Sequence, residues 1–141
     1  MGIYSIAVRT ANMTISQTSI TMVTSSTVRA TIFENGLTIA FANASTYGLG
    51  HPGAGTTLGT TSNGQPEDLA GPSSPTQVGT TWTTQPTAPA NYLRRTNLPA
   101  TVGAGIIWTF PRGITIPVSN SMCIYNISAV SNSDIWYVWD E

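Results

Sequence analysis

The chain of 141 residues has no lysine, one cysteine and one histidine, and only 8% of its residues are charged. An ordinary soluble domain carries about 25% charged residues. Few charges leave exposed strand edges poorly protected against pairing with other chains. We interpret the shortage as a surface that partner molecules largely cover. A surface solvated by threonine, serine, asparagine and glutamine is the alternative.

The five cationic side chains are all arginines, and the formal net charge is −1. Binding to nucleic acid needs several clustered cations, so we expect no nucleic-acid partner. A phosphate-binding loop of the P-loop type also needs a lysine. Arginine instead suits protein interfaces, because its planar guanidinium binds carboxylates with two parallel hydrogen bonds.

The single cysteine, Cys123, excludes a disulfide within the chain, and its apolar neighbours predict a buried, inert thiol. Residues 1–9 lack the basic start and apolar core of a secretion signal. No apolar run approaches the roughly 18 residues that a membrane-spanning helix needs. We therefore expect synthesis without export and no membrane partner.

Short runs of β-branched and aromatic residues, separated by Gly, Pro, Asn and Ser, predict an all-β fold. Residues 101–141 contain three of the four tryptophans and read as a closing array of strands. We expect a single domain over residues 1–141 with about eight antiparallel strands, enough for two packed sheets or a closed barrel. Residues 42–79, rich in Gly, Thr, Ser and Pro, are expected to form a long loop or arm that becomes ordered against a neighbouring subunit.

Two local patterns carry more specific expectations. Asn35-Gly36 lies between alternating runs, which fits either a hairpin turn or a bulge within one long strand, and we favour the bulge. Pro111 and Gly113 suit the second and fourth positions of a turn between two strands.

No pattern of catalytic, cofactor-binding or metal-ligating residues emerges, and we predict none. Residues 48–53 match a dinucleotide glycine fingerprint, but Pro52 and the glycines and threonines after it predict no helix to hold a pyrophosphate. His51 has no partner that would make it a base or a zinc ligand. The pairs Glu67-Asp68 and Asp140-Glu141 lie outside any calcium-loop pattern and are expected to be solvated. Paired glycosidase carboxylates remain an open alternative.

The aromatic and arginine residues are the positive feature of the sequence. Trp136, Tyr137 and Trp139 place large rings on both faces of one strand, so one face is expected to pack in the core and the other against a partner. Because protein interfaces are enriched in aromatics and arginine, the candidate partner-interface residues are Trp82, Tyr92, Arg94, Arg95, Trp108, Arg112, Trp136, Tyr137 and Trp139.

Residues 98–113, Leu-Pro-Ala-Thr-Val-Gly-Ala-Gly-Ile-Ile-Trp-Thr-Phe-Pro-Arg-Gly, and the ending Trp-Tyr-Val-Trp-Asp-Glu resemble small structural proteins of tailed bacteriophages. The whole chain is similar to the jelly-roll head decoration (cement) proteins in its size, its expected all-β fold and its low content of charged residues. The resemblance implies a jelly-roll homotrimer on the outer capsid surface of the virion, made in the host cytoplasm. Its partner would be the major capsid protein, whose neighbouring subunits it clamps, with no cofactor and no small-molecule substrate.

Two other classes of function remain as alternatives. A fibre-tip domain or carbohydrate-binding module for host attachment would also use exposed aromatic rings. A cell-wall hydrolase is a third possibility, for which the sequence offers no catalytic constellation.

Overall fold

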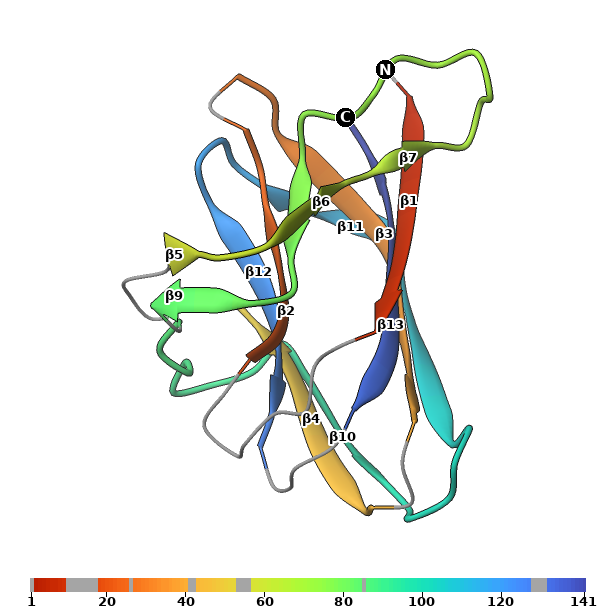
Figure 1. The fold of residues 1–141 in the computed structure, drawn as a ribbon, viewed down its shortest axis with the longest axis vertical. Coiled ribbons are helices and arrows are strands. Elements are labelled where there is room, and N and C mark those ends of the chain that lie inside the picture. The colour runs from red at the N-terminus through yellow and green to blue at the C-terminus, as the bar shows by residue number, and fades with distance from the viewer. Residues whose placement is uncertain are drawn as a thin grey trace.

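The computed structural model describes residues 2–9, 18–25, 27–40, 43–52, 57–84, 86–127 and 132–141. These residues form thirteen strands and no helix. Eleven of the strands form two antiparallel sheets that pack as a sandwich (Figure 1), and the other two form a separate pair. The predicted all-β fold is therefore confirmed. Eight of the strands have five or more residues, and the other five have two or three.

The five-stranded sheet has the order β11-β3-β13-β1-β7. Its strands are β1 (Ile3–Arg9), β3 (Ala30–Ile39), β7 (Gln65–Pro66), β11 (Gly105–Ile116) and β13 (Ser133–Asp140). The six-stranded sheet has the order β10-β4-β12-β2-β8-β6. It contains β2 (Thr18–Val23), β4 (Ser45–Gly50), β6 (Thr61–Asn63), β8 (Gln77–Gly79), β10 (Arg94–Leu98) and β12 (Ser121–Asn126). A separate pair joins β5 (Thr57–Leu58) to β9 (Trp82–Thr84).

The core lies between the two sheets. Burial along β13 alternates residue by residue, as the pleat of a strand requires. Ile135, Tyr137 and Trp139 therefore face inward and are buried. They join buried side chains of the opposite sheet, such as Met22, Leu49, Met122 and Ile124, in one hydrophobic cluster.

The strand β3 runs unbroken through Asn35 and Gly36. This confirms the expected single long strand and excludes the hairpin. The irregularity in its pairing lies at Phe33, between the partners of Ile32 and Glu34, and not at Gly36.

The predicted turn at residues 111–113 is corrected by the structure. β11 continues through Pro111, and the register against β3 shifts between Thr109 and Ile114. Pro111 is tolerated because β11 is an edge strand, where a missing N–H breaks no ladder bond on the open side. Gly113 takes a φ of +69°, a backbone conformation that side chains disfavour.

Residues 42–79, expected to be an extended loop or arm, contain β4, β5, β6, β7 and β8. β4 lies inside the six-stranded sheet, where it pairs with both β10 and β12. The segment is therefore part of the sandwich itself.

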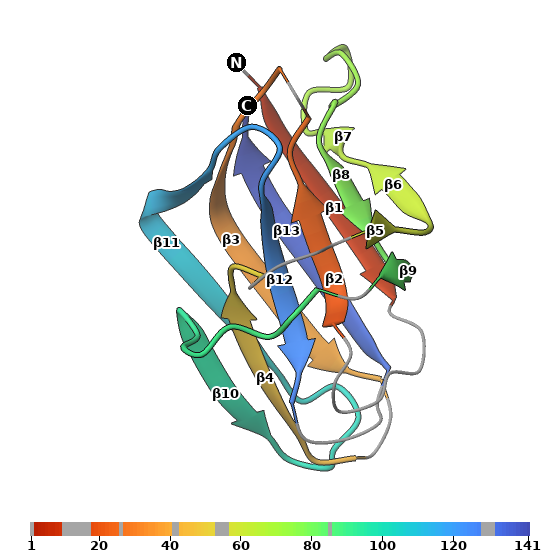
Figure 2. The same ribbon diagram turned by 90° about the vertical axis from the view of Figure 1, so that its left-hand side faces the viewer.

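The two sides of the sandwich differ (Figure 2). On one side, the chain passes from β6 in one sheet directly to β7 in the other. On the opposite side, β10 and β11 end their sheets, and no described strand pairs with their outer edges. We call this second side the open side.

Candidate interaction site

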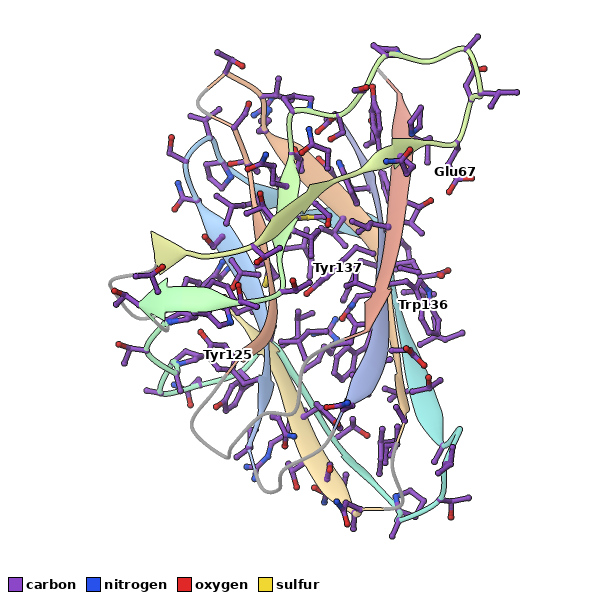
Figure 3. The ribbon with its side chains drawn as sticks, viewed as in Figure 1. Glu67, Tyr125, Trp136 and Tyr137 are labelled. Atoms are coloured by element: carbon purple, nitrogen blue, oxygen red, sulfur yellow. The ribbon has the colours of Figure 1, made fainter. Side chains whose placement is uncertain are left out.

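Three of the nine candidate residues belong to the core. Trp108, Tyr137 and Trp139 are buried within the chain itself, and Trp139 stacks on Tyr4 with ring centroids 6.2 Å apart. Figure 3 shows Tyr137 between the sheets and Trp136 on the other side of β13. These three rings are thus placed inside the domain and not on a surface that a partner could reach.

Trp136 lies on the outer face of the five-stranded sheet, since burial alternates along β13. Its ring occupies the space above Gly36 on the neighbouring strand, where an added Cβ would come within 2.0 Å of the indole. The indole N–H donates to Glu34 Oε1 at 2.9 Å. Trp136 is half-buried by these contacts, so the glycine and the carboxylate fix its orientation.

Residues 86–93 form a covering segment over the outer face of the six-stranded sheet. The ring of Tyr92 lies against Gly48, and Pro89 lies against Gly50. Tyr92 also meets Tyr125 edge to face at 5.7 Å, and the Tyr125 hydroxyl donates to the carbonyl of Thr87. The glycines that resembled a nucleotide fingerprint therefore make room for this segment.

Cys123 lies on the same outer face and is fully buried, as predicted. Burial raises the pKa of its thiol to about 12, although hydrogen bonds to Thr21 and Tyr125 act in the opposite direction. Burial likewise raises the pKa of the Tyr125 hydroxyl. The thiol is therefore a neutral packing group at physiological pH.

The open side brings together two of the candidate arginines. The guanidinium of Arg94 lies 5.5 Å above the centre of the Phe110 ring, and one of its nitrogens donates to the carbonyl of Leu93 at 2.7 Å. Arg94 and Arg112, with Phe110, Pro111, Gly113 and Ile114, line a cavity of about 350 Å³. We call this the arginine pocket. It spans both sheets, since Arg94 belongs to β10 and the other residues belong to β11.

The two remaining candidates lie elsewhere. Arg95 follows Arg94 on β10 and is exposed, but it does not line the arginine pocket. Trp82 lies on β9, pairs with Leu58 and is half-buried.

A second cavity, of about 460 Å³, lies where the two ends of the described chain meet. Gly2 and Glu141 exchange backbone hydrogen bonds there. Asp68 and Glu141 line the cavity with Tyr4 and Pro66. Glu141 Oε2 accepts hydrogen bonds from the hydroxyl of Thr76 and the indole of Trp139. This carboxylate therefore holds its own domain together, whereas it was expected to be solvated.

Residues 67–71 form an exposed turn beside this cavity, which we call the acidic loop. Its tip, Leu69, is 100% exposed, and Glu67 and Asp68 precede it. Figure 3 shows Glu67 on this loop as it projects beyond the sandwich. The sequence does not mark Leu69 as exposed, because its exposure depends on the path of the chain between β7 and β8.

The described residues contain no group of three or more His, Cys, Asp or Glu side chains that could hold a metal ion. Within the same ranges, no helix is long and apolar enough to cross a membrane. His51 is exposed and lies 3.3 Å from the carbonyl of Ser121. The search against protein families, curated proteins and solved structures finds no match to this chain.

Proposed function

We propose that the chain is a structural virion protein, a decoration or cement protein that binds the outer capsid of a tailed bacteriophage as a trimer. It stabilises contacts between neighbouring major capsid subunits. Binding that favours the assembled shell over its separated subunits stabilises the shell by mass action.

The strand order is the observation that carries this proposal. The eight long strands divide equally between the sheets, as β11-β3-β13-β1 and β10-β4-β12-β2. With one exception, the step from β4 to β10, each long strand is followed along the chain by a long strand of the opposite sheet. This arrangement supports a jelly roll, an eight-stranded double sheet that is common in viral capsid proteins.

The positions of the charged side chains also support a binding role. The exposed arginines Arg94 and Arg112 line a pocket at the open side, while the exposed carboxylates Glu67 and Asp68 lie on the acidic loop beside the cavity at the termini. A surface that separates its charges in this way suits docking to complementary surfaces.

The proposal is tested with purified capsid shells that lack the chain. We expect the added protein to co-sediment with expanded shells and to raise the temperature at which the shells disassemble. Protein that stays in the supernatant at saturating concentration would contradict the proposal.

A carbohydrate-binding or fibre-tip module is the second candidate, and Trp136 is the observation that favours it. Its ring lies on an outer sheet face beside a carboxylate, and sugars stack on such rings. Titration with host surface glycans, followed by tryptophan fluorescence, separates the two functions. Saturable quenching that Trp136→Ala abolishes would favour the glycan module.

A further inference from the structure

The arginine pocket combines two arginines with an apolar surface. Stacking on Phe110 and the bond to the Leu93 carbonyl hold Arg94 in place. Neither Arg94 nor Arg112 forms an ion pair with a carboxylate among the residues that the structure describes. The floor between them is apolar, formed by Phe110, Pro111 and Ile114. A ligand that fits would present carboxylates beside an apolar group.

The acidic loop presents that combination. Glu67 and Asp68 supply two carboxylates, and the fully exposed Leu69 supplies the apolar group. A contact that removes a fully exposed leucine from water is favourable, because it buries apolar surface.

The loop is also held in one shape. The N–H of Glu67 donates to the Ile3 carbonyl at 2.8 Å, which ties the loop to β1. The N–H of Gly71 donates to the carbonyl of Asp68, and the N–H of Ala70 donates to Asp68 Oδ1. A prearranged loop loses less conformational entropy when it binds.

The loop cannot reach the pocket of its own chain. It follows β7, at one end of the five-stranded sheet, whereas the pocket is built on β11 at the other end. Figure 2 shows β7 and β11 on opposite sides of the sandwich. Any contact between them must therefore join two molecules.

We propose that the acidic loop of one copy docks into the arginine pocket of a second copy. Glu67 and Asp68 pair with Arg94 and Arg112, and Leu69 packs on the apolar floor. Because the two surfaces differ, the contact is heterologous and generates a closed ring or an open chain of copies. This inference deepens the proposed trimer by naming its contact. It is tested without capsids, so its failure would leave the capsid-binding test standing.

The test is the mass of the purified protein in solution, measured by light scattering after gel filtration over a range of concentrations. We expect the wild-type protein to exceed the monomer mass of 14.9 kDa. Arg94→Glu with Arg112→Glu should weaken self-association about 100-fold, because like charges then face each other. Leu69→Asp should also weaken it. Raising the ionic strength from about 0.1 M to about 1 M should shift wild type toward monomer, since the Debye length falls from about 10 Å to about 3 Å.

Matched variants separate this contact from a general effect of charge. Arg95→Glu changes a neighbouring arginine outside the pocket and should leave the mass unchanged. A fourfold reversal, Glu67→Arg, Asp68→Arg, Arg94→Glu and Arg112→Glu, restores complementarity and should restore the wild-type mass. Circular dichroism and urea unfolding identify variants that misfold, and the fourfold reversal tests the proposal independently of them. A wild-type monomer at every concentration would overturn the proposal, as would pocket variants that associate like wild type.

Discussion

At the scale of single residues, aromatic rings explain two glycines that local sequence patterns assign to other roles. Gly36 follows an asparagine and resembles a turn or bulge, yet its strand is continuous and the Trp136 indole occupies its side-chain space. Gly48 belongs to a nucleotide-like pattern, but the ring of Tyr92 lies against it. In both cases the reason for the glycine lies in a residue more than forty positions away, so no local pattern could reveal it.

The Gly36 contact predicts a clear stability effect. Gly36→Ala should lower the free energy of unfolding by about 1–3 kcal/mol, because the added methyl group forces the Trp136 ring to move. Urea unfolding measures this cost. In a Trp136→Ala background the same substitution should cost much less. An equal cost in both backgrounds would place the cause in the backbone and contradict the ring contact.

At the scale of elements, the sequence predicts strands well where short runs of β-branched and aromatic residues lie between turn residues. Residues 135–139 are such a run, but they are apolar throughout, so the sequence does not tell which rings face the core. Tyr137 and Trp139 were therefore predicted as interface candidates, although both are buried. The sequence predicts less well where strands are short or rich in glycine. The sequence of β4, Ser-Thr-Tyr-Gly-Leu-Gly, predicts a loop because it is rich in glycine. In the structure these glycines leave space for the covering segment. The arginine pocket forms because β10 and β11, which belong to different sheets, lie close together. No local sequence pattern predicts this contact.

The covering segment predicts the reactivity of Cys123. In the native protein near pH 8, the thiol should react with a maleimide far more slowly than in urea, because it is buried and its pKa is raised to about 12. Tyr92→Ala removes the ring that covers this face, so it should lower the free energy of unfolding and speed the labelling. Leu93→Ala, at the next and exposed position, is the matched control and should change both little. Equal labelling rates in the two variants would contradict the covering role.

The raised pKa of Cys123 also predicts how the free energy of unfolding depends on pH. Its pKa is higher in the folded protein than the ordinary value of 9.0, so the unfolded chain loses the proton first as pH rises. The contribution of Cys123 to the free energy of unfolding is therefore fully present below about pH 9 and is lost progressively as the pH rises toward about 12. Cys123→Ala should flatten this part of the curve in urea titrations at increasing pH. A wild-type curve that rises above pH 9 would contradict the assignment.

At the scale of the whole molecule, one side of the sandwich is closed and the other is left open. The passage from β6 to β7 joins the two sheets on the first side. On the second side lies the arginine pocket, and no described strand pairs with the outer edges of β10 and β11. Unpaired strand edges promote pairing with other chains, and only 8% of the residues of the chain are charged. Both features are expected of a protein that works in an assembly, which is the central claim of the proposed function.

The number of copies in purified virions tests that claim most directly. Quantitative mass spectrometry against the major capsid protein gives the ratio of the two chains. The proposed function predicts a copy number of the same order as that of the capsid subunits, with the chain released by treatments that strip the outer surface. A handful of copies per particle, or copies that remain with isolated tails, would contradict it.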